Sequence, residues 1–170
     1  MNRFVRRTIV AAAIVAAPLL AGTPALAAAG TTTPKQPAVV DAVAYEAEVV
    51  KLTNAERTAQ GCPALRIDER LVAAARAHST DMVRAGFFSH TGSDGTNFVA
   101  REVAAGYPRK GASAENIAWG YRTPRDVVKA WMNSPGHRKN ILNCASIAVG
   151  VGLAIKPGGA PYWTQDFGRI

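Results

Sequence analysis

The chain has 170 residues, of which 48% are hydrophobic, and its 20 lysines and arginines exceed its 12 acidic residues to give a formal charge of +8. This length suits one compact domain. The basic residues are scattered and no nucleic-acid-binding motif is present, so we expect no nucleic-acid partner. The mild positive excess favours a solvated surface or loose attachment to an anionic cell envelope.

Residues 1–29 have the features of a secretory signal peptide. Arg3, Arg6 and Arg7 precede an apolar run over 8–21, and small residues suited to cleavage follow it. The run is shorter than the ~20 residues that a membrane-spanning helix needs, and no other segment approaches that length. We therefore expect a secreted, extracellular protein without a transmembrane segment; an uncleaved N-terminal anchor is the alternative.

The remaining chain divides into a flexible lead-in over 30–42 and one domain over 43–170. The lead-in contains two prolines and three consecutive threonines and lacks apolar periodicity. The domain has a size typical of a single compact unit and shows no internal repeat. We expect it to be a monomer.

Two long helices are predicted in the first half of the domain. Apolar residues recur at helical spacing over 42–58, and Asp68 is expected to cap a second helix that ends at Gly86. His78 falls on the apolar stripe of this second helix. We therefore interpret His78 as a histidine of the core rather than as a ligand.

Two shorter helices are predicted next. Asp94 or Thr96 is expected to cap a helix that ends near Gly106. Thr123 and Pro124 have the residue types of a cap and a first helical turn, and they predict a helix that stops before the following proline.

The end of the domain has the pattern of a β-hairpin. Branched and small residues alternate over 147–155, a Pro-Gly-Gly turn follows, and 162–167 forms the partner strand. The glycines indicate that one face of the first strand lies close to other backbone. Helices followed by a hairpin predict an α+β fold rather than βαβ repetition.

The two cysteines, Cys62 and Cys144, are expected to form a disulfide. An even pair in an exported chain is typical of a structural bridge. The closed loop of roughly 80 residues would stabilise the fold by about 4–5 kcal/mol in the chain-entropy model. Two free thiols or two zinc ligands are the alternatives, and the chain has no Cys-x-x-Cys spacing to favour them.

Three side chains are candidates for chemistry. His90 joins an apolar segment to a loop rich in glycine, serine and threonine, and His137 follows a Pro-Gly pair where a short helix can begin. Glu115 lies among small and apolar residues, where an unpaired carboxylate is costly, so we expect a histidine partner for it. Two imidazoles and one carboxylate could also supply three of the four ligands of a zinc site, although no local zinc motif is present.

Serine chemistry has less support. Ser89 adjoins His90, and Ser134 lies three residues before His137, but neither serine stands in a Gly-x-Ser-x-Gly elbow. The aromatic residues are interpreted mainly as core and groove walls, with a lipid or peptide cleft as the alternative.

A series of motifs in a fixed order carries a family resemblance: Phe88-Ser89-His90, Glu115-Asn116-Ile117-Ala118, Ser134-Pro135-Gly136-His137-Arg138, Gly150-Val151-Gly152 and Tyr162-Trp163-Thr164-Gln165-Asp166-Phe167. Together they resemble a bacterial member of the CAP superfamily, which groups cysteine-rich secretory proteins, antigen 5 and pathogenesis-related 1 proteins and is also called the SCP domain. The resemblance covers about residues 46–168.

This resemblance implies a three-layer α-β-α sandwich with a central antiparallel sheet and an open cleft. It implies that His90 and His137 are the cleft histidines, which bind zinc or another divalent cation in some members, and that Glu115 is the first of two glutamates. The second glutamate position is occupied by Ser134, which leaves a His-Glu-His set with a neutral hydrogen-bonding neighbour. The family implies no single reaction.

The leading hypothesis is therefore a binding protein rather than an enzyme. Its cleft, formed by His90, Glu115, Ser134 and His137, would hold a divalent cation or a small amphipathic ligand such as a sterol-like lipid or a peptide, and no cofactor would be required. The alternative is a metal-assisted hydrolase of peptides or cell-wall material, with Glu115 as the candidate catalytic base and the metal on the two histidines. A purely structural polar set is the third hypothesis.

Overall fold

The computed structural model describes residues 40–156 and 158–170, so the expected signal peptide and most of the lead-in lie outside the described residues. The helices are α1 (Ala42–Ala59), α2 (Glu69–Ala85), α3 (Phe98–Ala104), α4 (Pro124–Asn133), α5 (Pro135–Ile141) and the 3₁₀ turn η1 (Arg109–Gly111). The strands are β1 (Arg66–Ile67), β2 (Ala112–Trp119), β3 (Ala148–Ile155) and β4 (Pro161–Gly168). No helix among the described residues is long and apolar enough to cross a bilayer.

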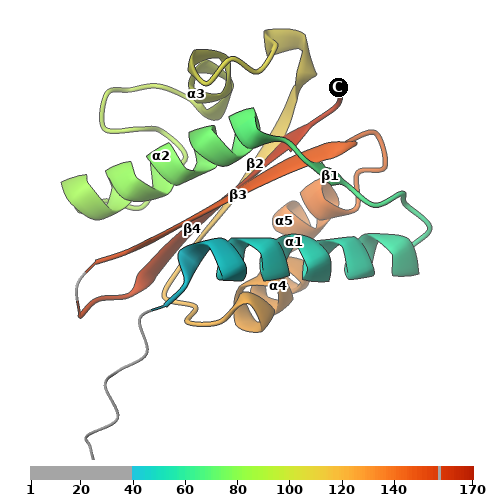
Figure 1. The fold of residues 1–170 in the computed structure, drawn as a ribbon, viewed down its shortest axis with the longest axis horizontal. Helices are drawn as coiled ribbons and strands as arrows, with labels where there is room; N and C mark the ends of the chain where they lie inside the picture. Colours follow the sequence, from blue (N-terminus) through green and yellow to red (C-terminus); the bar gives the residue numbers. More distant parts are fainter. Residues whose placement is uncertain (1–39, 157) are drawn as a thin grey trace, which may run out of the picture. The chain divides into compact units, whose positions relative to one another are not determined.

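The strands form one sheet in the order β1-β3-β4-β2, and helices cover both of its faces. Figure 1 shows α2 and α3 on one face and α1, α4 and α5 on the other. The α+β, three-layer prediction is confirmed. The sheet is antiparallel except for the two-residue β1, which pairs with β3 in parallel. Strand β2 has no counterpart among the predicted elements.

Local signals set the helix ends as predicted, with one correction. The side chains of Asp68 and Thr123 accept hydrogen bonds from the first turns of α2 and α4, and Gly86 closes α2 with a left-handed φ of 72°. The predicted cap of α3 was wrong. Asn97 caps that helix, because Asp94 instead accepts hydrogen bonds from the backbone and hydroxyl of Thr96.

Glycines let α2 pack directly on β3, as the sequence pattern predicts. A Cβ atom built on Gly150 would meet the backbone carbon of Leu71 at 2.1 Å, and one built on Gly152 would meet that of Ala75 at 2.3 Å. No side chain larger than hydrogen fits in this space. The side chains of Val149, Val151 and Leu153 therefore lie on the opposite face, where they join the apolar core with residues of α1 and α4.

The main apolar core lies between the sheet and α1, α4 and α5. Its largest buried members are Trp131, Trp163, Phe167 and Ile141, each at most 1% exposed. The indole nitrogens of the two tryptophans donate to backbone carbonyls, so their polar ends are satisfied. This core holds α4 and α5 firmly against the sheet.

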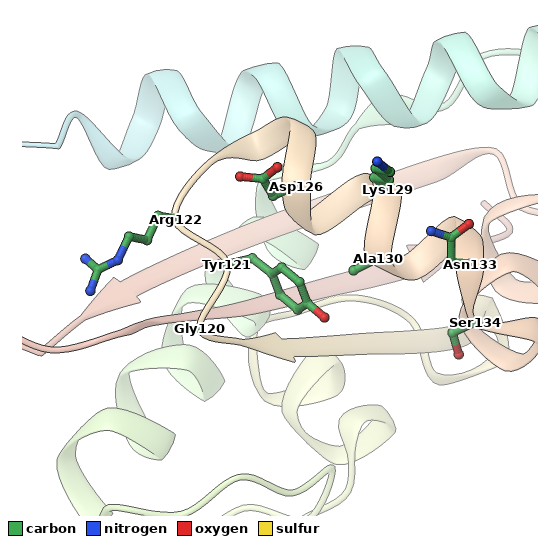
Figure 2. Close-up of a pocket in the computed structure, with 8 residues that line it drawn as sticks. All are labelled: Gly120, Tyr121, Arg122, Asp126, Lys129, Ala130, Asn133 and Ser134. Atoms are coloured by element: carbon green, nitrogen blue, oxygen red, sulfur yellow. The ribbon is translucent and has the colours of Figure 1, made fainter.

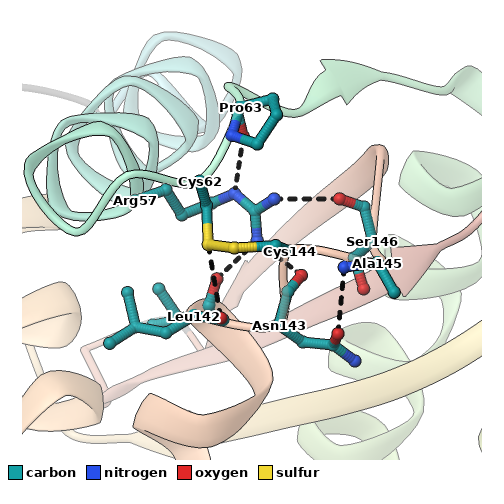
Figure 3. The surroundings of a disulfide bond; sticks show 9 residues. Arg57, Cys62, Pro63, Leu142, Asn143, Cys144, Ala145 and Ser146 are labelled. Carbon is teal, nitrogen blue, oxygen red and sulfur yellow. Dashed lines mark hydrogen bonds between the residues drawn. A yellow bond between two sulfur atoms is a disulfide. The ribbon is translucent and has the colours of Figure 1, made fainter.

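The predicted disulfide joins Cys62, just after α1, to Cys144, just after α5. Beside it the guanidinium of Arg57 is fully buried and donates to four carbonyl oxygens (Figure 3), those of Pro63, Ile141, Asn143 and Ser146. Burial lowers the pKa of Arg57. The disulfide and this arginine tie the end of α1 to the segment that follows α5.

Candidate functional site

A buried carboxylate on β2 holds one of the predicted histidines. Nδ1 of His90 lies 2.7 Å from Oε1 of Glu115, whose side chain is 1% exposed, while the His90 side chain is 55% exposed. The carboxylate accepts, so Nδ1 carries the proton and Nε2 is the ring nitrogen left for solvent or a ligand. The expected histidine partner of Glu115 is therefore His90.

Arg101, on α3, completes this arrangement. Its Nη2 donates to Oε2 of Glu115 at 2.5 Å and to the carbonyl of His90 at 3.1 Å, and its Nη1 donates to the carbonyl of Thr96. One guanidinium thus fixes the carboxylate, the histidine backbone and the loop between them. Both oxygens of Glu115 are engaged, one by an imidazole and one by an arginine.

Two more carboxyl groups lie behind Glu115. Asp166 is the cross-strand partner of Glu115 on β4, and Glu102 follows Arg101 on α3; both are fully buried. Burial and the neighbouring negative charges raise the pKa of Glu102 to about 8 and the pKa of Asp166 well above its usual range. Their oxygens have no hydrogen-bond partner among the described residues. At pH 7 the carboxyl of Glu102 is therefore mostly protonated, and burial favours the neutral form of Asp166. We call Glu102, Glu115 and Asp166 the buried carboxyl cluster.

His78, on α2, contacts the backbone of the loop that carries His90. It is fully buried on α2, as expected for a core histidine, and its Nε2 lies 2.9 Å from the carbonyl of Ser89, the residue before His90. Burial lowers the pKa of His78, so the ring is neutral and Nε2 donates to that carbonyl. The core histidine thereby helps to position His90.

His137 lies on α5, where an amide network fixes the helix to β2. Asn140 donates to the side-chain oxygen of Asn116 at 2.9 Å, and Asn116 donates to the carbonyl of His137 and to Gln165. Burial, and secondarily the neighbouring imidazole of His90, lowers the pKa of His137. The imidazole is neutral at pH 7 and retains a lone pair for a ligand.

The two histidines line one cleft of about 540 Å³. Its walls come from β2, from the segment before His90 and from α4 and α5: Phe88, Ser89, His90, Ile117, Ala118, Trp119, Tyr121, Ala130, Trp131, Ser134 and His137. Three of these aromatic side chains are substantially exposed, Phe88 at 49%, Trp119 at 54% and Tyr121 at 40%. Exposed aromatic area beside two imidazoles is suited to an amphipathic ligand.

A second, more polar hollow of about 620 Å³ adjoins the first. It shares Tyr121, Ala130 and Ser134 with the cleft and adds charged side chains, those of Arg122, Asp126 and Lys129. Figure 2 shows Tyr121 on the loop after β2 and Ser134 at the end of α4. Ser134 thus lies at the junction of the two hollows.

The residues suit a cation only in part. His90 and His137 face the cleft, but Glu115 is turned inward and does not line it. Within residues 40–156 and 158–170 no three histidine, cysteine or acidic side chains are placed to hold a metal together. Catalytic zinc centres use three protein ligands, whereas this cleft offers two imidazoles.

The sequence patterns do not identify the residues that surround Glu115. Arg101 and Glu102 lie on a short helix without a motif, and Asp166 lies in the last strand, where the pattern indicates no role for it. Each is brought to Glu115 by tertiary packing or strand pairing. A carboxylate in the apolar stretch around Glu115 is the one signal in the sequence that points to a partner.

The sequence profile of the cysteine-rich secretory protein family (CAP) matches residues 50–167. The uncharacterized protein YkwD of Bacillus subtilis (strain 168) is 47% identical over 146 residues, which are 85% of this chain and 54% of YkwD. The uncharacterized membrane protein YlbC of the same organism is 34% identical over 122 residues, 72% of this chain and 34% of YlbC. The chain therefore spans about half of the first relative and a third of the second.

Two solved structures share the fold. An extracellular protein containing a SCP domain from Bacillus anthracis str. Ames superimposes with a TM-score of 0.71 at 29% identity, covering 79% of this chain and 45% of that one. An outer surface protein from Borrelia burgdorferi gives a TM-score of 0.64 at 22% identity, covering 71% of this chain and 89% of that one. The second likeness concerns the fold alone.

Proposed function

Because this chain belongs to the cysteine-rich secretory protein (CAP) family, we propose that it acts outside the cell as a binding protein whose cleft takes an amphipathic ligand. The observation that carries this proposal is the pairing, in one cleft, of exposed aromatic rings with two imidazoles. The apolar part of the ligand would lie on Phe88 and Trp119, and its polar part would reach His90 and His137. The extracellular relative from Bacillus anthracis supports the location.

The geometry of the His90–Glu115 pair favours ligand binding over catalytic turnover. Glu115 directs both oxygens to His90 and Arg101, so its role is to orient His90 and to fix the loop. A candidate nucleophile, Ser134, faces the cleft, but its hydroxyl has no hydrogen bond to either histidine among the described residues. A bound ligand would meet Nε2 of His90 as a hydrogen-bonding group.

The test is an NMR titration of the ¹⁵N-labelled protein with two probes, palmitate and a pool of random capped octapeptides. We expect shifts confined to cleft residues with at least one probe. Trp119→Ala should weaken that binding several-fold, whereas Val43→Ala, which trims an exposed apolar residue of α1 away from the cleft, should not. No shift at the cleft with either probe at millimolar concentration would contradict the proposal.

We also propose that a divalent cation binds reversibly to His90 and His137. The neutral state of His137 favours it, and water would complete the coordination. Calorimetry with zinc should show binding that is lost in the double variant His90→Ala/His137→Ala. Unchanged zinc binding in that variant would place the cation elsewhere.

The second candidate is a hydrolase of peptides or cell-wall material. Its specific support is that Glu115 holds the proton on Nδ1, which leaves Nε2 of His90 free to move a proton. Turnover of a peptide substrate by the wild type, with and without zinc, and its loss in His137→Ala would support this candidate. Binding of a probe without turnover would favour the binding protein.

A further inference from the structure

The free side of an edge strand borders the cleft. Strand β2 has β4 as its single neighbour in the sheet. The backbone N–H of Gly120 donates to the carbonyl of Pro161 at 2.9 Å, and hydrogen-bonded pairs alternate along an antiparallel ladder. Ala118 is therefore turned toward β4, whereas Ile117 and Trp119 direct their N–H and C=O groups outward.

Two side chains confirm this direction and close the first part of the free edge. The carbonyl of Glu115 accepts from Nδ2 of Asn140 at 3.3 Å, and the carbonyl of Ile117 accepts from Nε1 of Trp131 at 3.2 Å. Beyond them the edge borders the cleft, where Trp119 is 54% exposed and Ile117, although it lines the cleft, is 5% exposed. Among the described residues, the N–H groups of Ile117 and Trp119 and the carbonyl of Trp119 form no hydrogen bond outside β2.

At the opposite edge of the same sheet, outward backbone groups of β3 have hydrogen-bond partners. Strand β1 covers the first residues of β3, and farther along the backbone N–H of Leu153 donates to Oε1 of Glu46 at 2.9 Å. Arg76 holds that buried carboxylate with a donor at 2.9 Å. The protein thus closes one edge with an ion pair, whereas among the described residues two backbone donors are unpaired where the other edge meets the cleft. Open edges pair readily with another extended chain.

The walls of the cleft suit a chain laid along this edge. The side chain of Phe88 lies on one side of β2, and Ser134 and His137 lie on the other. Phe88 and Trp119 each approach the ring of Tyr162, with centroids 6.4 and 6.2 Å apart, so the aromatic side is continuous. A strand added to an edge directs its side chains alternately to the two sides, which matches this division.

We infer that an extended polypeptide segment of another protein binds in the cleft as a strand added to Ile117–Trp119 of β2. This inference rests on the proposed function and names its ligand class. Two outward N–H groups two residues apart match the repeat of carbonyls along a peptide. A fatty acid has a single carboxylate and could satisfy at most one end of this edge.

The experiment measures amide hydrogen exchange of the ¹⁵N-labelled wild type with the random octapeptide pool. The control pool carries an N-methyl group at every residue, which removes the backbone donors from both edges of the peptide. We expect the amides of Ile117 and Trp119 to exchange about tenfold more slowly with the first pool than with the second. The same measurement with palmitate, a ligand that cannot add a strand, is the third arm of the experiment.

Slower exchange at both amides with the unmethylated pool alone supports strand addition. Equal effects of the two pools, or shifts with palmitate and none with peptides, overturn the strand while the proposed binding function stands. No response to any probe overturns both. Pairing of two copies of this chain through β2 would slow these amides in a concentration-dependent way without any probe, and it too overturns the inference.

A pair of variants isolates the backbone donor. Trp119→Pro removes the outward N–H at the last residue of an edge strand, where proline is tolerated, whereas Trp119→Ala keeps that N–H and removes the same ring. We expect the peptide pool to bind about threefold to tenfold more weakly to the proline variant than to the alanine variant. Equal affinity would contradict the inference, and the exchange measurement on the wild type holds even if the proline variant misfolds.

Discussion

Glu115 and Asp166 lie directly opposite each other across β2 and β4, both in the protein interior, and only Glu115 is paired with a cation, the guanidinium of Arg101. Glu115 has His90 and Arg101 as partners, whereas Asp166 has a raised pKa because it is buried beside other acidic groups. Two carboxyl groups this close cannot both ionise at low cost. The buried carboxyl cluster thus keeps protons at neutral pH directly behind the cleft histidine.

The cluster predicts that stability falls as the pH rises. The pKa of Glu102 is about 8 in the folded protein, against an ordinary value of 4.5 for the unfolded chain. Between these pH values the unfolded chain binds fewer protons than the folded one, so the free energy of unfolding decreases as the pH rises. The stability contributed by protonated Glu102 is fully present below pH 4.5 and is lost by about pH 8. Urea denaturation of wild type and Glu102→Gln between pH 5 and 8 should show a smaller decline in the variant. Glu56→Gln, at an exposed position of α1, is the control and should keep the wild-type slope.

Arg101 is predicted to be the costliest single residue of the site to replace. Its side chain is 10% exposed, and Arg101→Met would leave the buried carboxylate of Glu115 with the histidine alone. Breaking a buried ion pair in this way costs about 3–5 kcal/mol of unfolding free energy. Chemical denaturation of wild type and Arg101→Met measures this loss of unfolding free energy. Lys51→Met, which breaks the exposed pair between Lys51 and Glu48, should produce no measurable change, and equal effects of the two variants would contradict the assignment.

The close contact of α2 with β3 predicts an asymmetric response to added methyl groups. Gly152→Ala would place a Cβ 2.3 Å from the backbone of Ala75, so we expect a loss toward the upper end of the about 1–3 kcal/mol that overpacking costs. Gly136→Ala is the matched control, since a Cβ there meets nothing within 4 Å. Thermal unfolding of the two variants should separate them clearly, and a neutral Gly152→Ala would show that α2 can shift.

The disulfide is predicted to stabilise the folded state mainly through the unfolded chain. Cys62 and Cys144 are 82 positions apart, so the chain-entropy model gives about 4–5 kcal/mol for the bridge. The double variant Cys62→Ser/Cys144→Ser should lose most of this in urea denaturation. The buried guanidinium of Arg57 still binds the neighbouring carbonyls, so we expect the variant to fold; a native spectrum with unchanged stability would contradict the entropic estimate.

Hydrogen-bonding residue types next to helix starts, and glycines at helix ends, act within a few residues of the chain. For this reason Asp68, Gly86 and Thr123 could be assigned from the sequence. The close approach at Gly150 and Gly152 was also predictable, because glycines that alternate with branched residues in a strand leave one of its faces without side chains. The pairing of Cys62 with Cys144 needed only their number and an oxidising location.

The tertiary structure decided what depends on distant residues. Strand β2 escaped prediction because alanine, serine, glutamate and asparagine have low strand propensity, and only its pairing with β4 and the contacts of Asn116 and Trp131 hold it extended. The sequence by itself determined that Glu115 needed a partner, since a carboxylate in apolar surroundings must be satisfied. Which groups surround that carboxylate, with His90 and Arg101 as partners and Asp166 as a second carboxyl across the sheet, followed from packing between segments that no local pattern relates.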